Sequence, residues 1–129
     1  MNNNINEKRP LSPHLTIYRP QNTSILSILH RLTGIGLMFT SLVLVIWIIT
    51  IPLGPEYFDF VMYLFSTFLG KTFLIFSLWG ITYHSMTGIR HLIWDTGRGI
   101  DLKWVNLSSW FIVVGSFLLT SVIIFWVNG

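Results

Sequence analysis

A long uncharged stretch dominates the first half of the chain. Residues 32–52 read LTGIGLMFTSLVLVIWIITIP, and no charged side chain occurs between Arg31 and Glu56. A helix needs roughly 20 mostly apolar residues to cross the hydrocarbon layer of a membrane. This stretch therefore predicts a transmembrane helix.

Two further apolar stretches follow. The last one, residues 107–127, carries no charge between Lys103 and the C-terminus. The middle one contains Lys71. It predicts either a long tilted helix whose lysine reaches the outer interface, or a short interfacial segment ahead of the span.

These stretches together define the expected fold class and domain organisation. We expect an all-α integral membrane protein with three transmembrane helices, at about residues 28–52, 62–93 and 106–127. Residues 1–21 would form a cytoplasmic N-terminal segment. Residues 22–129 would form a three-helix transmembrane domain that is part of a membrane-anchor helix bundle.

The composition excludes several classes of protein. Of the 129 residues, 52% are hydrophobic and only 10% are charged, against about a quarter charged in soluble domains. The chain has no cysteine, which rules out disulfides, thiolate-bound iron–sulfur clusters and covalently attached c-type haem. The net charge is +3, but the basic residues lie beside the predicted spans and form no continuous patch, so we expect membrane lipid and not nucleic acid as the surroundings.

Basic residues are distributed unevenly around the predicted spans. The first loop carries Glu56 and Asp59. The basic side chains before the first span and in the second loop are Lys8, Arg9, Arg19, Arg31, Arg98 and Lys103. Cytoplasmic segments are enriched in lysine and arginine, so the N-terminus and the second loop are expected in the cytoplasm and the C-terminus outside.

The first 28 residues are polar and punctuated by proline, unlike a removable signal peptide. We expect a multi-pass protein of the bacterial inner membrane, or of the mitochondrial inner membrane if the chain is organelle-encoded.

The second helix presents a candidate haem-binding face. Gly80, His84 and Gly88 are spaced by four residues, so they stack on one face with the imidazole between two residues that lack side chains. A flat macrocycle could approach such a face, and neutral histidine is a common axial ligand of haem. The alternative is that the glycines only allow another helix to pack closely, with His84 hydrogen-bonding across the contact.

Polar groups near the same end of this helix suggest a place for charged substituents. His91 lies seven residues after His84 and therefore on nearly the same face, with Arg90 and Asp95 beside it. Haem b carries two propionates, which favour cationic partners at the membrane edge. An interfacial histidine that only meets water is the alternative for His91.

The first helix begins with a polar stripe. Ser24, Ser27 and Arg31 lie three and four residues apart, so their hydroxyl and guanidinium donors share one side of the helix. These donors could bind a carbonyl oxygen of a ligand that arrives through the membrane, such as a quinone. The alternative is an anchoring arginine with a capping serine.

In the third helix, Gly115, Ser116 and Thr120 are small residues suited to helix packing.

Two local patterns resemble a known family, the cytochrome b556 subunit of succinate dehydrogenase. The first is RPLSPHLTIY at residues 9–18 followed by SILHRLTG at residues 27–34. The second is HSMTGIRHLIWD at residues 84–95. With the three predicted spans, the resemblance extends over nearly the whole chain.

The resemblance implies a role in electron transfer. In that family the chain pairs with a second small membrane-anchor subunit and shares one haem b with it, so His84 is expected as one axial ligand of the haem iron. His30, Arg31 and His91 match polar positions near the haem propionates, and Ser27 and Arg31 match positions that line a quinone site. Succinate is oxidised at FAD in a flavoprotein subunit, and electrons pass through an iron–sulfur subunit to the quinone. This chain would not carry the succinate-oxidising site.

Two other classes of function compete with this interpretation. One is a cofactor-free structural membrane anchor of a related oxidoreductase. The other is a small transporter or proton channel, which would normally show discontinuous helices with charges near the middle of the membrane. The charges here gather near the predicted cytoplasmic edge, which disfavours a transporter.

Reporter fusions test the predicted orientation. Alkaline phosphatase becomes active only outside the cytoplasm, so a fusion after Gly129 should be active and a fusion after Gly99 inactive. The opposite pattern of activities would invert the topology.

Overall fold

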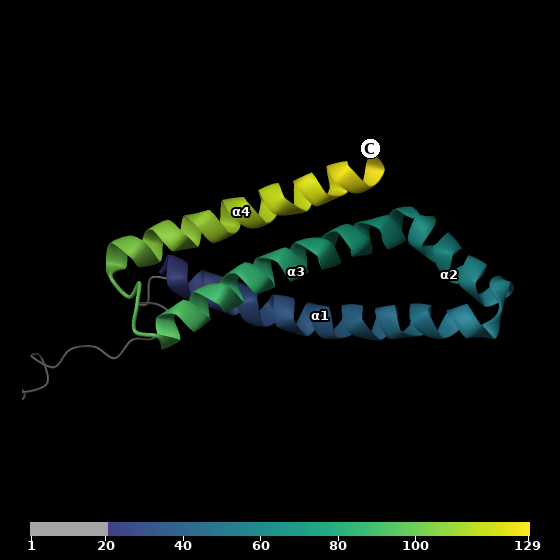
Figure 1. The fold of residues 1–129 in the computed structure, drawn as a ribbon, viewed down its shortest axis with the longest axis horizontal. Helices are drawn as coiled ribbons and strands as arrows, with labels where there is room; N and C mark the ends of the chain where they lie inside the picture. The colour runs from purple at the N-terminus through teal and green to yellow at the C-terminus, as the bar shows by residue number, and fades with distance from the viewer. Residues whose placement is uncertain (1–20) are drawn as a thin grey trace, which may run out of the picture.

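The computed structural model describes residues 21–129, and these form helices joined by short connections. In chain order the helices are α1 (Asn22–Leu53), α2 (Pro55–Ser66), α3 (Phe68–Asp95) and α4 (Leu102–Asn128). Figure 1 shows α3 between α1 and α4, with α2 closing the far end of the α1–α3 pair. The predicted N-terminal segment lies outside the described residues, apart from Gln21.

Glycine and proline mark the connection between α1 and α2. Pro52 lies in the last turn of α1, and Pro55 occupies the first turn of α2, where its missing N–H leaves no donor stranded. Gly54 between them has a φ of 124°, a backbone conformation that side chains disfavour. The chain therefore turns sharply within one residue.

The connection between α2 and α3 is a sharp bend at Thr67. The two helix axes meet at 79°, and the Thr67 side chain caps α3 by accepting a hydrogen bond from the Gly70 backbone N–H at 3.1 Å. A Cβ atom at Gly70 would collide with the backbone carbonyl oxygen of Leu64. The bend thus depends on a glycine at position 70.

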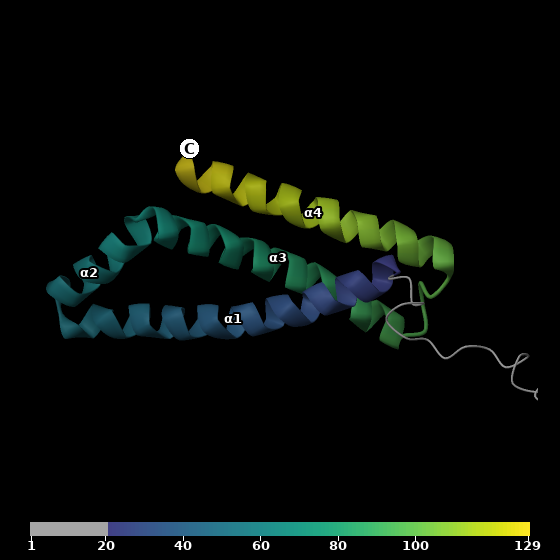
Figure 2. The ribbon, with the colours of Figure 1, turned by 180° about the vertical axis from the view of Figure 1, so that it is seen from behind.

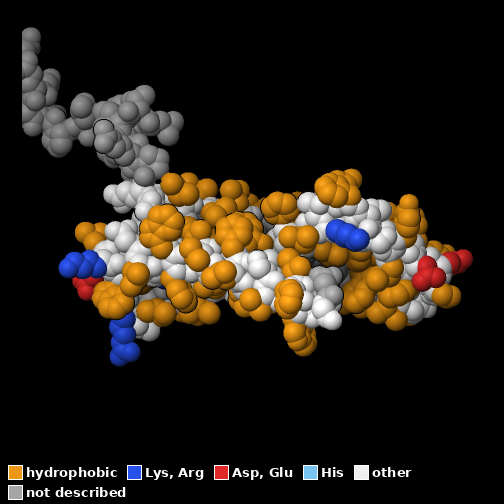
Figure 3. All heavy atoms as spheres, turned by 90° about the horizontal axis from the view of Figure 1, so that it is seen from above, with side chains coloured by type: hydrophobic (Ala, Val, Ile, Leu, Met, Phe, Trp, Pro, Cys, Tyr) orange, Lys and Arg blue, Asp and Glu red, His pale blue; other side chains and the backbone are white. Residues whose placement is uncertain are grey.

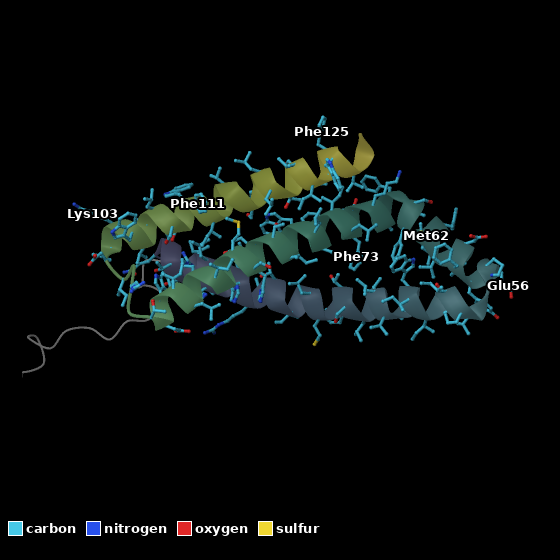
Figure 4. All side chains as sticks on the ribbon, viewed as in Figure 1. Glu56, Met62, Phe73, Lys103, Phe111 and Phe125 are labelled. Carbon is cyan, nitrogen blue, oxygen red and sulfur yellow. The ribbon has the colours of Figure 1, made fainter. Side chains whose placement is uncertain are left out.

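The bend changes the expected extent of the middle helix. A single helix over residues 62–93 does not form, because Thr67 divides that range between α2 and α3. A short helix, α2, precedes the longer α3, which is the shape that the second alternative described. An apolar cavity of about 320 Å³ lies inside this corner, and Met62 of α2 and Phe73 of α3 contribute to its lining (Figure 4).

The all-helical character of a membrane protein is confirmed over the described residues. Helices α1 and α4 are each long and apolar enough to cross a membrane, whereas α2 and α3 meet that criterion only as a bent pair. Most large apolar side chains are exposed, for example Phe68 at 83% and Phe125 at 81%. Figure 3 shows hydrophobic side chains over the middle of one face and most charged ones near its two ends. Lipid or another membrane helix must cover such a surface.

Helix α3 holds the described residues together, because it packs on both α1 and α4. The buried apolar core is small and consists of Leu26, Tyr83 and Ile112, one residue from each of these helices. The Tyr83 hydroxyl, fully buried, donates a hydrogen bond to the Leu26 carbonyl oxygen at 3.0 Å. The view from behind shows that the start of α1, the end of α3 and the start of α4 meet at one end of the molecule (Figure 2).

Hydroxyl groups and small residues line the contact between α3 and α4. Thr82 of α3 lies 2.9 Å from the Thr120 hydroxyl and also contacts the Ser116 carbonyl oxygen at 3.4 Å. A Cβ atom at Gly115 would lie 2.8 Å from the Met86 methyl carbon. The small residues expected to serve packing in this part of the chain therefore do so.

Replacing Gly70 with alanine should open the bend at Thr67. Because the chain has no cysteine, spin labels can be placed through cysteines introduced at the exposed positions 57 and 75, and the distance between them measured. Gly70→Ala should lengthen or broaden that distance, since the added Cβ meets backbone atoms that cannot move independently.

Gly36→Ala is the matched control, because no atom lies within 4 Å of a Cβ built at Gly36. A distance distribution that stays unchanged in Gly70→Ala would contradict the packing argument.

Candidate functional site: the histidines between α1 and α3

Three histidines come together where α1 and α3 pack. The rings of His30 on α1 and His84 on α3 are stacked, with centroids 4.0 Å apart and planes inclined by 14°. The ring of His91, two turns further along α3, lies 5.2 Å from that of His30. His30 therefore bridges the two histidines that the spacing of α3 places on one face.

The hydrogen bonds of His84 determine which ring nitrogen carries the proton. Its Nδ1 lies 3.2 Å from the His30 backbone carbonyl oxygen and 3.2 Å from the Thr33 hydroxyl oxygen. A carbonyl oxygen can only accept, so the first contact is a hydrogen bond only when Nδ1 is protonated. The proton on Nδ1 leaves the lone pair of the neutral ring on Nε2.

This arrangement fits an axial ligand of haem. Metal-bound histidines usually donate the second ring nitrogen to a carbonyl or another acceptor, which is how Nδ1 of His84 is engaged. No group of three or more histidine, cysteine or acidic residues suited to a metal ion occurs within residues 21–129. A metal at His84 would need most of its ligands from elsewhere, as an iron in a porphyrin has.

Glycines on both helices control how closely α1 and α3 approach. A Cβ at Gly34 of α1 would lie 3.2 Å from Cε1 of His84, so the glycine makes room for the imidazole. Gly80 of α3 is buried and faces Leu37 of α1, whereas no atom lies within 4 Å of a Cβ built at Gly88. Gly80 thus serves helix packing, as the alternative explanation proposed, and only Gly88 is open to an approaching group.

His84 also hydrogen-bonds across the helix contact, as that alternative explanation required. The bond to the His30 carbonyl oxygen joins α3 to α1. It uses Nδ1 alone, however, and a structural hydrogen bond at Nδ1 is compatible with metal ligation at Nε2.

The surroundings of His91 differ from the expected row of polar groups at the membrane edge. Its Nδ1 lies 2.9 Å from the Thr87 carbonyl oxygen of its own helix, and its ring meets Trp94 edge-on at 5.4 Å. Arg90 was expected at the membrane edge, but its side chain is buried, with only 5% of its surface exposed. Its Nη1 donates a hydrogen bond to the Ser109 hydroxyl of α4 at 3.0 Å. Its guanidinium carbon also lies 4.6 Å from the centre of the Trp94 ring. Arg90 therefore joins α3 to α4, because its neighbours on α4 and the Trp94 ring enclose it.

Ser27 and Arg31 lie on a more open side of α1. Arg31 is exposed and Ser27 is half-buried. Neither side chain takes part in a hydrogen bond or ion pair within residues 21–129. They lie four positions apart on one helix, so their donors lie one turn apart.

Two residues that contribute to the histidine cluster were given no role by the sequence. They are Thr33 and Gly34. Thr33 and Gly34 follow His30 by three and four residues, which places them on the same side of α1. That spacing is a signal in the sequence, but only the contact with α3 gives it a meaning.

Comparison with known proteins identifies the family. Residues 5–123 match the family described as succinate dehydrogenase/fumarate reductase transmembrane subunit. A succinate dehydrogenase cytochrome b556 subunit of Rickettsia prowazekii is 47% identical over 116 residues, which cover 90% of each chain. One from Paracoccus denitrificans is 34% identical over 121 residues, 92% of this chain and 93% of the relative. A cytochrome b560 subunit of Reclinomonas americana is 36% identical over 122 residues, 91% of this chain and 85% of the relative. With nearly the whole chain matched, this protein belongs to the succinate dehydrogenase/fumarate reductase transmembrane subunit family.

Proposed function

We propose that this chain is a membrane-anchor subunit of succinate dehydrogenase that holds haem b and forms part of the quinone-reduction site. The observation that carries the proposal is the state of His84, whose Nδ1 proton is engaged by α1 and whose Nε2 lone pair is left for a metal. Membership of the family supports it, because its relatives are named as cytochrome b subunits of succinate dehydrogenase.

The proposal includes three crossings of the membrane. Helices α1 and α4 provide two, and α3, with α2 as the bent segment ahead of it, provides the third. With three crossings, the start of α1 would lie at the cytoplasmic side and the end of α4 at the outer side, as the distribution of basic residues predicts.

The role of His84 is to bind and orient the haem. Haem b, when bound, supplies a one-electron redox centre near the quinone. Gly34 lets the His84 ring lie against α1, and the hydrogen bonds at Nδ1 hold the ring in one orientation. The second axial ligand would come from a second small membrane-anchor subunit. The start of α1 and the end of α3 lie at the same end of the molecule. His30, Arg31 and His91 lie toward that end relative to His84, and we propose that the propionates lie there as well.

Ser27 and Arg31 are proposed to bind the quinone head group. Neither side chain uses its donors within residues 21–129, and Arg31 is exposed. An arginine keeps its charge, so Arg31 can polarise a quinone carbonyl oxygen but cannot supply the proton that reduction requires. The proton must come from water or from a partner subunit. The iron–sulfur and flavoprotein subunits, with their clusters and FAD, would supply electrons from succinate.

A cofactor-free anchor remains the second candidate, because the cross-helix hydrogen bond of His84 would serve packing alone. The visible spectrum of the purified complex separates the two functions. A reduced b-type spectrum is expected for the haem subunit and none for the structural anchor.

His84→Leu should abolish or strongly perturb the b-type absorbance of the purified complex, because leucine offers no ligand. Thr72→Leu is the control on the same helix, because Thr72 lies twelve residues from His84 and its hydroxyl donates to the Phe68 carbonyl oxygen of α3 itself. The control should keep the absorbance. An unchanged reduced spectrum and midpoint potential in His84→Leu would remove the histidine from the haem site.

Arg31→Leu should impair quinone reduction while succinate oxidation with a soluble dye acceptor stays nearly intact. A charge-assisted hydrogen bond contributes on the order of 1.5–3 kcal/mol, which corresponds to roughly a ten- to hundredfold loss in affinity or rate. Arg98→Leu is the control, because Arg98 is an exposed arginine in the connection between α3 and α4.

Comparing quinone reduction with dye-linked succinate oxidation in Arg31→Leu also shows which results would contradict the proposal. Equal loss of both would mean that the complex does not assemble. Full retention of quinone reductase activity would remove Arg31 from the quinone site.

A further inference from the structure

The Thr33 side chain occupies a central position in the histidine cluster. Thr33 is buried on α1, and its hydroxyl oxygen lies 2.8 Å from the His30 carbonyl oxygen and 3.2 Å from Nδ1 of His84. The same carbonyl oxygen lies 3.2 Å from that Nδ1. The three atoms therefore form a closed triangle between α1 and α3.

The direction of each hydrogen bond in the triangle follows from the chemistry of the groups. The His30 carbonyl can only accept, so the Thr33 hydroxyl donates its proton to it. The lone pairs of the hydroxyl oxygen then accept from Nδ1–H of His84, which is shared between the two oxygens. Two acceptors on one N–H restrict both the tautomer of the imidazole and its rotation about the bond to Cβ.

We propose that Thr33 is a positioning residue that holds the His84 imidazole with its Nε2 lone pair directed at the haem iron. This inference rests on the proposed function, since it assigns a residue that acts on the ligand and does not itself touch the haem. Gly34 completes the arrangement, because a side chain there would press on Cε1 of the same ring.

The physical need for such a residue comes from the directionality of the metal–nitrogen bond. A neutral histidine with its proton on Nε2 offers no lone pair to iron at that atom, and a rotated ring directs the lone pair elsewhere. Groups that hydrogen-bond a metal-ligating histidine typically change metal affinity by roughly ten- to hundredfold when they are removed. Within this chain the Thr33 hydroxyl is the only side-chain partner that the structure gives to His84 Nδ1 over residues 21–129.

The test compares three variants in the assembled complex. Thr33→Val keeps the shape of the side chain but removes the hydroxyl, whereas Thr33→Ser keeps the hydroxyl and removes the methyl group. Thr40→Val is the matched control, because Thr40 also lies on α1 and its hydroxyl bonds across to α3, at 2.9 Å from that of Ser77, without touching a histidine. Each complex is measured for the rate of haem loss to an excess of a haem-scavenging apoglobin and for the midpoint potential of the haem.

Thr33→Val should release haem roughly ten- to hundredfold faster than the unmodified complex and should show a shifted midpoint potential. Thr33→Ser and Thr40→Val should behave as the unmodified complex does. If Thr33→Val is too damaged to retain haem, a normal Thr33→Ser complex still supports the proposal, because the two variants differ in the hydroxyl.

Three outcomes would overturn the positioning role. They are a Thr33→Val complex with unchanged haem loss and potential, equal effects of Thr33→Val and Thr40→Val, and equal damage in Thr33→Val and Thr33→Ser. Failure of the proposed function has a different signature, because either the unmodified complex would then show no b-type spectrum or His84→Leu would keep that spectrum, whatever the Thr33 variants do.

Discussion

Hydrocarbon offers no hydrogen-bond partner, and this constraint governs the polar groups of the membrane-spanning helices. An unpaired backbone N–H or C=O in the membrane costs several kcal/mol, so the segments between connections are helical. The same cost applies to side chains. Most threonine and serine hydroxyls donate back to their own helix, as Ser116 does to the Val113 carbonyl oxygen. Where a polar side chain reaches a neighbouring helix instead, it joins the two helices.

Helix α3 carries such contacts on two sides, and the two sides differ in chemistry. Toward α4 it presents Thr82 and Arg90, which hydrogen-bond to hydroxyl groups of that helix. Toward α1 it presents His84, which uses one ring nitrogen and keeps the other. The side facing α4 therefore holds the bundle, and the side facing α1 combines packing with the proposed haem site.

The basic side chains in this structure differ in how far they are exposed. Lys71 and Arg31 are exposed, so a flexible chain can carry their charges to water. Arg90 is enclosed between α3 and α4, where a hydroxyl and an aromatic ring surround its guanidinium. That difference is why two arginines near one end of the bundle play separate roles, with only Arg31 available to a quinone in our proposal.

Periodicity and the distribution of charge were sufficient to predict an all-helical membrane protein, because hydrocarbon leaves few alternatives for an uncharged stretch such as residues 32–52. The motif around His84 was equally visible in the order of residues. Local sequence left open whether a short segment precedes the middle span and did not place the bend at Thr67, which depends on how Gly70 meets the preceding turn. Nor did it assign Gly80 and Arg90 to helix contacts, since both depend on which helix lies opposite. The Nδ1 proton of His84 is decided by tertiary structure alone, because its acceptors, the His30 carbonyl and the Thr33 hydroxyl, lie more than fifty residues earlier in the chain and meet the ring only when α1 packs on α3.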